Sequence, residues 1–424
     1  MIILAYILSG LSLLLSVLFF IQFDIPSEKL PPFGVIAKLI AGALSPIWVV
    51  AGIVGAVIGC VYQAFWAIPM GILGAGIMIW FIWSCTRDHK GFDKAFGPDW
   101  SDQIPPEQAR RMIQKRWTWF LKMKESPETV WERDVPFWTV PDSDRQLLCD
   151  IWSRADGNVS GLGIIFIHGG GWTSMDKDML TRPFFRHLTS QGHTVMDVAY
   201  RLSPEVDMFD MIGDIKRAVA WMKDNATKFG VNPNKIAVVG SSVGGHLAQL
   251  TGYAPQHPDL TPDDLKNVDL SVCGIISSFG PSDLLVEYEH SQVKQRSENR
   301  PPYPIGTKLE ANQEFLFSGR LDMILGGHLQ DIPETYQLFS PITHVHPDCP
   351  PTLLIQGDKD MLVPLEITIA LYQKLIELGV PAINVVFSGA EHGFDLLLPQ
   401  ISPPAQSALY DVDRFLALML RKDK

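Results

Sequence analysis

Cysteine is scarce in this sequence of 424 residues, and its five occurrences lie far apart. They stand at Cys60, Cys85, Cys149, Cys273 and Cys349. None has the C-x-x-C spacing of a zinc site or redox motif, and an odd number does not suit a disulfide framework. We therefore expect ordinary buried thiols. A metal-binding motif and a phosphate-binding loop are also missing, so we expect no metal and no cofactor.

Basic residues are fewer than acidic ones, so the formal net charge is −11 and the pI is near 5.5. This balance argues against nucleic acid as a partner. Charge of either sign is rare near the N-terminus: residues 2–23 carry none, and residues 34–83 carry one, Lys38. The hydrophobic content of 47% and the mean hydropathy of +0.12 also favour a membrane part.

Two apolar stretches near the N-terminus are long enough to cross a bilayer, which takes about 20 residues. Residues 2–23 suffice for one helix, and residues 34–83 for two, which we place at 40–62 and 65–83. The first run lacks the basic start and small-residue end of a secretory signal, so an uncleaved helix is favoured. We predict a membrane segment over residues 1–86 with about three transmembrane helices.

Positive charge flanks these spans unevenly. The first loop region carries Lys29 and Lys38, the second has no basic residue, and Arg87, Lys90 and Lys94 follow the last span. The positive-inside rule therefore predicts an integral membrane protein whose C-terminal domain faces the cytoplasm.

Glycines recur inside the apolar stretches. Gly55 and Gly59 form a G-x-x-x-G pair, and Gly71, Gly74 and Gly76 follow. Small residues allow helices to pack closely in lipid, but membrane helices are also rich in glycine generally. Both interpretations remain open. No ionisable residue is expected in mid-membrane, so a transport path has no support.

Residues 87–124 are interpreted as a linker and an amphipathic helix. The stretch 92–103 is polar, and 105–122 has Pro near its start and Lys near its end, as helices often do. Trp117 and Trp119 lie among basic residues there. This helix is predicted either to pack on the following domain or to lie at the bilayer surface.

Strand and helix patterns alternate over residues 125–424, which predicts a mostly parallel sheet covered by helices on both faces. Strands are expected at 137–140, 146–152, 163–167, 194–200, 235–239, 272–278, 351–356 and 382–387, and helices at 212–229, 365–378 and 405–420. The alternation breaks down between about 281 and 340, where 315–329 looks helical. We interpret this stretch as a cap insertion over the carboxyl edge of the sheet.

A serine flanked by glycines follows one of these strands, in Gly240-Ser-Ser242-Val-Gly244. Strand, G-x-S-x-G and helix in succession are typical of a nucleophile elbow. The tight turn requires glycine on either side and exposes the Ser242 hydroxyl at the end of the sheet. The N–H group of Val243 is left free to bind an oxyanion.

A second motif, His168-Gly-Gly-Gly-Trp172, follows the strand at 163–167. Three consecutive glycines let the backbone aim N–H groups at a point where negative charge develops. We expect Gly170, Gly171 and Val243 to form an oxyanion hole, with Gly169 as a further candidate.

Together these motifs resemble the hormone-sensitive-lipase and acetyl-esterase group of α/β-hydrolases over about residues 130–420. The residues that carry the resemblance are His168-Gly-Gly-Gly-Trp172, Tyr200-Arg-Leu, Gly240-Ser-Ser-Val-Gly-Gly-His246, Leu325-Gly-Gly, Ser340-Pro-Ile-Thr, Gly357-Asp-Lys-Asp360-Met-Leu-Val-Pro364 and Glu391-His392-Gly-Phe394. The resemblance implies an α/β-hydrolase fold. This sequence has Val243 where the family usually has alanine.

The order of the family, nucleophile then acid then histidine, selects Ser242, Asp360 and His392. Asp358 is the alternative acid, and it lies nearer to the end of its strand. Three further histidines are alternative bases: His246, His344 and His346.

The function that this reading implies is a membrane-anchored serine carboxylesterase acting on small-molecule or lipid esters. A deacetylase or a prenylcysteine methylesterase on the same scaffold is an alternative. A catalytically inactive membrane scaffold is a third possibility.

Overall fold

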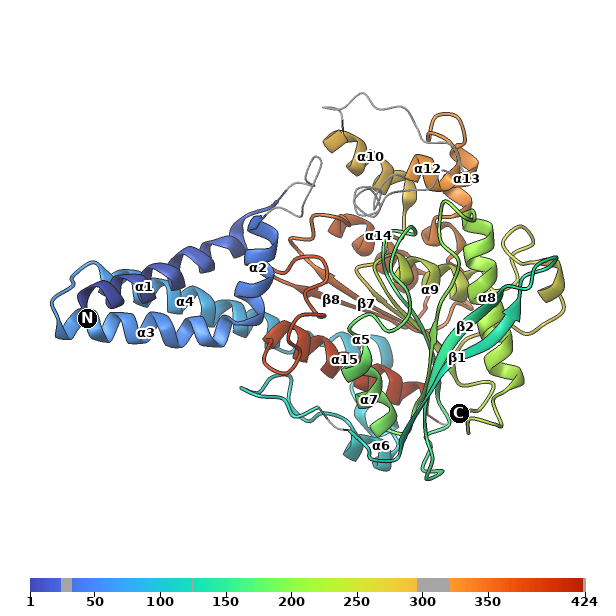
Figure 1. Cartoon of the computed structure of the whole chain (residues 1–424), viewed down its shortest axis with the longest axis horizontal. Coiled ribbons are helices and arrows are strands. Elements are labelled where there is room, and N and C mark those ends of the chain that lie inside the picture. The colour runs from blue at the N-terminus through green and yellow to red at the C-terminus, as the bar shows by residue number, and fades with distance from the viewer. Residues whose placement is uncertain (24–32, 124, 296–320, 422–424) are drawn as a thin grey trace.

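The computed structural model describes residues 1–23, 33–123, 125–295 and 321–421. A bundle of apolar helices from the N-terminal part projects from a rounded domain that is built on one sheet (Figure 1). The two parts meet at the end of the bundle that lies opposite the N-terminus.

The sheet has eight strands in the order β1-β2-β4-β3-β5-β6-β7-β8. The strands span β1 Thr129–Thr139, β2 Gln146–Arg154, β3 Gly163–Ile167, β4 Thr194–Val198, β5 Ile236–Ser241, β6 Gly274–Ser278, β7 Thr352–Gly357 and β8 Ala382–Phe387. The β1–β2 and β2–β4 pairs are antiparallel, and every other neighbouring pair is parallel. The central strands β3, β4 and β6 are buried along their whole length, as continuous apolar runs in a two-sided sheet require. The predicted sheet is thereby confirmed.

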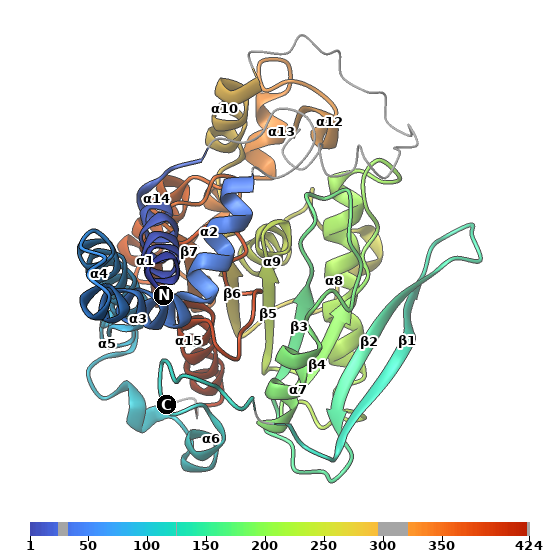
Figure 2. The same cartoon turned by 60° about the vertical axis from the view of Figure 1, so that its left-hand side comes forward.

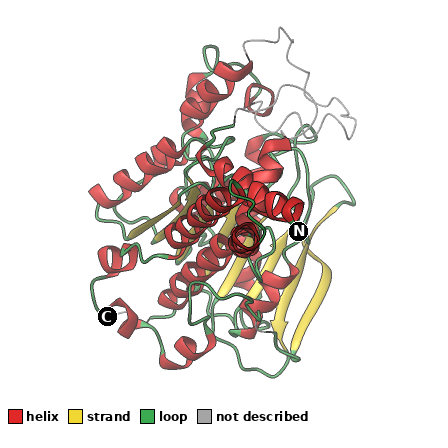
Figure 3. Cartoon of the chain, turned by 90° about the vertical axis from the view of Figure 1, so that its left-hand side faces the viewer, coloured by secondary structure: helices red, strands yellow, loops and turns green. Residues whose placement is uncertain are grey.

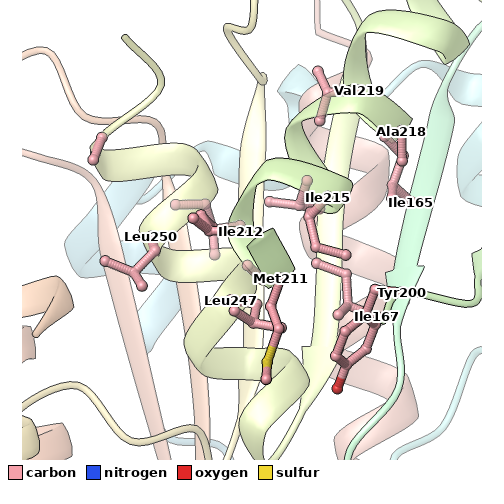
Figure 4. Close-up of a cluster of buried hydrophobic side chains, with 14 of the residues drawn as sticks. Ile165, Ile167, Tyr200, Met211, Ile212, Ile215, Ala218, Val219, Leu247 and Leu250 are labelled. Atoms are coloured by element: carbon pink, nitrogen blue, oxygen red, sulfur yellow. The ribbon is translucent and has the colours of Figure 1, made fainter. Parts of the chain in front are cut away.

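Helices cover both faces of this sheet (Figure 2). One face carries α8 Met208–Asp224, α9 Val243–Tyr253 and α14 Leu365–Glu377, and the other carries α7 Arg182–Ser190 and α15 Pro403–Met419. On the first face, Ile212 and Ile215 of α8 and Leu247 of α9 lie among side chains of the sheet such as Ile165 and Ile167 (Figure 4).

The N-terminal bundle contains α1 Ile2–Val17, α3 Ser45–Val61 and α4 Ala67–Thr86, which pack against one another. The short helix α2 Phe33–Ala43 lies at the base of the bundle and meets α3 at a bend of 83°. Two helical stretches, Ile2–Phe20 and Ala67–Phe96, are long and apolar enough to cross a membrane, and the bent pair α2–α3 makes a third if it counts as one span. The helix expected at 40–62 is therefore broken at residue 44. Lys29 of the expected first loop lies outside the described residues.

Close packing explains most of the glycines in this bundle. A Cβ on Gly52 would lie 2.7 Å from the carbonyl oxygen of Gly71, and one on Gly71 would lie 2.3 Å from that of Gly52. A Cβ on Gly55 would lie 2.5 Å from Ser9 Oγ. Gly76 has nothing within 4 Å of that position. Of the two interpretations left open by the sequence, close helix packing therefore holds at Gly55 and Gly71, and it holds also at Gly52, which the sequence analysis did not single out.

The connecting segment contains α5 Gly91–Phe96 and α6 Pro106–Arg111, so the helix expected at 105–122 was predicted too long. Beyond α6 the chain lies along α15: Ile113 N donates to Asp413 Oδ2 at 3.0 Å, and Thr118 N to Gln406 Oε1 at 2.8 Å. These side chains take the hydrogen bonds that a longer helix would have made internally. Of its two predicted placements, packing on the domain is the one observed for Ile113 and Trp117, whereas Trp119 is 60% exposed.

The stretch interpreted as a cap is described in part. It contains α10 Leu284–Gln295, α12 Leu321–Leu325 and α13 Pro333–Leu338, which pack together. Residues 296–320, including the start of the helix expected at 315–329, lie outside the described residues. Seen along the bundle axis, α10 and its neighbours stand to one side of the sheet (Figure 3).

All five cysteines are free thiols. Cys85, Cys149 and Cys349 are buried and Cys273 is intermediate, but Cys60 is exposed on α3. The expectation of buried thiols is therefore wrong for Cys60. Within the described residues, no group of three or more His, Cys, Asp or Glu side chains is arranged to hold a metal ion.

Candidate active site

Ser242 stands in a strained turn between β5 and α9. Its backbone angles are φ 55° and ψ −126°, a conformation that costs a non-glycine residue about 1–3 kcal/mol. The glycines on either side are required by contact, because a Cβ on Gly240 would lie 2.2 Å from Gly244 and one on Gly244 would lie 2.0 Å from Ile167 O. The turn is thus the elbow that the G-x-S-x-G pattern indicated.

The structure brings Ser242, His392 and Asp360 together at the carboxyl edge of the sheet. His392 Nε2 lies 3.0 Å from Ser242 Oγ, and His392 Nδ1 lies 2.8 Å from Asp360 Oδ2. Asp360 follows β7 and His392 follows β8, which are parallel neighbours. A hydrogen bond at Nδ1 leaves Nε2 free to accept the serine proton.

Three further donors hold the carboxylate of Asp360. Oδ1 accepts from Leu362 N at 2.8 Å and Val363 N at 2.9 Å, and Oδ2 accepts from Gln356 Nε2 at 2.9 Å. These bonds hold the carboxylate in place, with one oxygen directed at His392.

The alternative acid, Asp358, forms a hydrogen bond to a different residue. Its Oδ1 accepts from Gly389 N at 2.7 Å, so it ties the loop after β7 to the loop after β8. Burial raises the pKa of this carboxyl above its usual value. The geometry therefore favours Asp360 over Asp358 as the partner of His392.

The alternative bases point elsewhere. His246 Nε2 lies 2.8 Å from Phe339 O, and burial lowers its pKa to about 4. His344 Nε2 lies 2.7 Å from Leu338 O, and burial lowers its pKa as well. His346 lies in the turn before β7, and its backbone N–H contacts Cys349.

The loop after β3 carries the expected oxyanion donors and lies against the elbow. A Cβ on Gly169 would lie 3.3 Å from Ser242 Cβ, so the loop passes directly beside the nucleophile. Gly170 and Gly171 have φ angles of 113° and 63°, which only glycine adopts freely. Gly170 O accepts from Ser174 N at 3.0 Å and from Ser174 Oγ at 2.9 Å, which anchors the turn.

His168, at the start of this loop, is held for a structural task. Its Nδ1 donates to Gly169 O at 2.7 Å, its ring stacks on Tyr200, and Tyr200 Oη donates to His168 O at 3.1 Å. Burial lowers the pKa of His168, so the ring stays neutral. Tyr200, a member of the Tyr-Arg-Leu motif, thus supports the glycine turn.

Val243 is the first residue of α9, where backbone N–H groups have no partner within the helix. Its N–H therefore has no acceptor within the helix, and its role as an oxyanion donor stays a prediction. Its side chain is 3% exposed and belongs to the core cluster on the α8–α9 face.

Three residues of the site were missed by the sequence reasoning. Gln356, at the end of β7, binds the acid, and Phe279 packs on His392 with ring centroids 4.5 Å apart. A polar residue at the end of a buried strand was an available signal for Gln356. No sequence signal identified Phe279, which follows β6 with a φ of 43°. The third is Glu391, which directly precedes His392.

A comparison with protein-family models matches residues 149–375 to the BD-FAE family. The matched stretch is more than half of the chain, and it contains the glycine turn, Ser242 and Asp360. The chain belongs to the BD-FAE family. His392 lies beyond the matched residues.

Several curated relatives of this BD-FAE-family chain are named as esterases or ester hydrolases. It is 26% identical to Esterase LipQ of Mycobacterium tuberculosis over 317 residues, which cover 73% of this chain and 69% of LipQ. It is 29% identical to the probable carboxylic ester hydrolase LipM of the same organism, over 63% of this chain and 57% of LipM. The chain thus spans just over two thirds of LipQ and less than two thirds of LipM.

Solved structures agree with this assignment. The apo form of Thermogutta terrifontis esterase 2 matches with a TM-score of 0.54 and 25% identity, over 72% of this chain and all of the other. A truncated carbohydrate esterase from gut microbiota, 21% identical over 72% of this chain and all of that one, shares the fold with a TM-score of 0.52. The domain after the bundle is therefore an α/β-hydrolase, and the chain is a carboxylic ester hydrolase of the serine type.

Proposed function

We propose that this chain is a membrane-anchored serine carboxylesterase whose nucleophile, base and orienting acid are Ser242, His392 and Asp360. The observation that carries the assignment of residues is the pair of hydrogen bonds at His392, 3.0 Å to Ser242 Oγ and 2.8 Å to Asp360 Oδ2. Membership of the family supports the reaction class, and the geometry supports the roles.

In the first half of the proposed reaction, Ser242 Oγ attacks the carbonyl carbon of an ester while its proton passes to His392 Nε2. The bond between that carbon and the alcohol oxygen then breaks, and Nε2 returns the proton to the leaving oxygen. An acyl group is left on Ser242. Asp360 keeps the ring in the tautomer that this transfer requires and stabilises the imidazolium.

In the second half, the same nitrogen takes a proton from water, and the hydroxide attacks the acyl carbon. The carboxylic acid departs, and the proton returns to Ser242. In both halves, the N–H groups of Gly170, Gly171 and Val243, with Gly169 as a further candidate, face the negative oxygen. One such donor is worth about 3 kcal/mol of barrier.

For the substrate we propose short-chain or otherwise apolar carboxylic esters. The Thermogutta terrifontis enzyme has been solved with propionate and with butyrate bound, which supports a short acyl group. An anchored domain would meet esters that partition into the bilayer, which supports an apolar alcohol part. A series of p-nitrophenyl esters of increasing acyl chain length tests this proposal. Acetylated substrates test the deacetylase alternative, and prenylcysteine methyl esters test the methylesterase alternative.

The catalytic assignment is tested with a fluorophosphonate probe on the full chain in detergent. We expect labelling of the wild type, loss of labelling in Ser242→Ala, and retained labelling in the neighbouring Ser241→Ala. An unlabelled but folded wild type would instead support an inactive scaffold. Labelling that persists in Ser242→Ala would move the nucleophile to another residue.

The membrane anchor is supported by the surface of the bundle. Large apolar side chains face outward on its helices and on the turn between α3 and α4: Ile3 on α1 is 74% exposed, Trp66 in the turn 74% and Ile72 on α4 63%. A water-soluble bundle of this size would rarely expose so continuous an apolar surface. On the connecting segment, Trp119 and Phe120 are 60% and 68% exposed. That segment extends from the domain toward the side that carries the bundle (Figure 1).

Sidedness is tested by cysteine labelling in sealed vesicles, with Cys60 replaced by serine. Gln63 lies in the turn between α3 and α4, and Lys94 is exposed on α5 beyond the bundle. We expect Gln63→Cys to react with an impermeant maleimide only from the side opposite to Lys94→Cys, with Lys94→Cys facing the cytoplasm. Reaction of both from one side, or release of the chain by alkaline carbonate, would contradict the anchor.

A further inference from the structure

Lys38 is the single charged residue between positions 34 and 83, and it is buried where the bundle meets the hydrolase domain. It lies on α2 and is 2% exposed. Its Nζ lies 2.9 Å from Glu391 Oε1 and 2.8 Å from Ile21 O. In Figure 1, α2 stands between the bundle and the segment that follows β8.

Glu391 connects the two loops that carry the proposed acid and base. It directly precedes His392, and its second oxygen, Oε2, accepts from Met361 N at 3.2 Å. Met361 directly follows Asp360. One buried carboxylate therefore ties the backbone on either side of the His392–Asp360 hydrogen bond.

The N-terminal region reaches the same place at two more points. Gln22 Nε2 lies 3.4 Å from Asp360 O, and a Cβ on Gly389, in the loop after β8, would lie 3.0 Å from Phe19 Cβ. Phe19 in turn stacks on Phe81 of α4, with ring centroids 3.9 Å apart. The base of the bundle is thus packed against the loop that ends in His392.

Electrostatics explains why a lysine is needed here. Glu391 lies among carboxylates, since Asp360 and Asp358 belong to the same pair of loops, and burial raises the pKa of Glu391. Among the described contacts of Glu391, Lys38 supplies the compensating cation. Removing one partner from a buried pair leaves an uncompensated charge, which the loops relieve by moving or admitting water.

We propose that Lys38 and Glu391 are positioning residues for the hydrolytic reaction, through which the apolar N-terminal region holds the His392 and Asp360 loops in register. The proposal rests on the proposed function, because it takes these two residues as base and acid. It gives the N-terminal helices a second task besides anchoring: without their lysine the triad is misaligned.

The test uses the full chain in detergent with p-nitrophenyl acetate and a fluorophosphonate titrant. The variants are Lys38→Met, which leaves Glu391 uncompensated, and Glu391→Gln, which keeps the shape and the acceptor for Met361 N. Lys94→Met, on the exposed surface of α5, is the control. We expect kcat per titrated site to fall about 10- to 100-fold in the first two variants, because small misplacements of catalytic groups cost that much. KM should stay close to the wild-type value, and Lys94→Met should match the wild type.

The titration separates positioning from loss of folded protein. A misaligned triad reacts with the probe slowly but to the full extent, whereas partial unfolding lowers the extent and leaves the rate of the remaining sites unchanged. The double variant Lys38→Met/Glu391→Gln has no uncompensated charge, so its kcat should exceed that of Lys38→Met.

Three results would overturn the inference: a wild-type kcat in folded Lys38→Met or Glu391→Gln, a normal labelling rate with a reduced extent, or a double variant no faster than Lys38→Met. If Lys38→Met does not fold, the kcat of Glu391→Gln alone tests the inference. Failure of the proposed function looks different, since the wild type itself would then remain unlabelled or Ser242→Ala would still be labelled.

Discussion

Asp360 Oδ2 and His392 Nδ1 lie 2.8 Å apart, although the two residues are 32 positions apart in the chain. The contact exists because β7 and β8 are parallel neighbours, so that their carboxyl ends, and the loops that follow them, meet at one edge. Asp358 lies in the same loop as Asp360 but bonds to Gly389 N instead. The two carboxylates therefore allow a matched comparison.

We expect Asp360→Asn to lower kcat by about 10⁴-fold, because an amide favours the wrong tautomer of the histidine. Asp358→Asn retains an oxygen that accepts from Gly389 N, so its kcat should stay close to that of the wild type. Steady-state hydrolysis of p-nitrophenyl acetate measures both. Equal losses in the two variants would reject the assignment of the acid.

Gly170→Ala should disable the oxyanion turn. Its φ is 113°, and the added Cβ would lie 2.0 Å from Ser174 O, so the backbone must move. We expect kcat to fall about 10²- to 10³-fold, which is the effect of losing an oxyanion donor. Gly157→Ala is the control, since Gly157 also has a positive φ, 70°, but has nothing within 4 Å of the new Cβ. Wild-type turnover in Gly170→Ala would exclude this turn from the site.

Gly71→Leu should separate α3 from α4, because the side chain would enter the space occupied by Gly52 O. Gly76→Leu on the same helix places an equal side chain in open space. We expect the unfolding temperature in detergent to drop clearly in the first variant and little in the second, since overpacking typically costs about 1–3 kcal/mol. Similar temperatures for both variants would contradict the packing described for the bundle.

Lys216 should make stability depend on pH. It is buried on α8, its Nζ donates to Ala254 O at 2.7 Å and to Thr261 Oγ1 at 2.9 Å, and burial lowers its pKa to about 7 from an ordinary value of 10.5. Between these two values the unfolded chain binds a proton that the folded chain lacks, so this contribution to stability grows as the pH rises and is lost as it falls toward 7.

The measurement is the unfolding temperature of the wild type minus that of Lys216→Met, at pH 7 and at about pH 9.5. We expect the difference to shift in favour of the wild type at the higher pH. The corresponding difference for the exposed Lys94→Met should change little. A difference for Lys216→Met that is independent of pH would show that the buried amine does not titrate in this range.

Much of the candidate site was predictable because its signals are local. The glycines around Ser242 and in the loop after β3 are needed by turns that a few consecutive residues determine. The apolar runs from β3 to β8 bury both faces of a parallel sheet, and the helical patterns of α8, α14 and α15 follow the same logic over a slightly longer range. These features depend on short stretches of chain, so the sequence alone determined them.

Other features depend on partners that are distant in sequence. The helix expected at 105–122 ends at Arg111, because the chain beyond it bonds to Gln406 and Asp413 of α15. The choice between Asp358 and Asp360 also required the loop after β8 to be in place. The spacing of residues along the chain does not reveal these hydrogen-bond partners, because they lie far away in the sequence.

Lys38 shows most clearly the difference between what the local sequence determines and what the fold determines. The sequence by itself determined that one charge interrupts a long apolar stretch, that a serine stands in an elbow, and that a parallel sheet follows. Only the tertiary structure decided that this charge meets Glu391 beside His392, because an ion pair across 353 positions forms where helices and loops converge in space. A buried charge requires a partner, and the fold selects which one it finds.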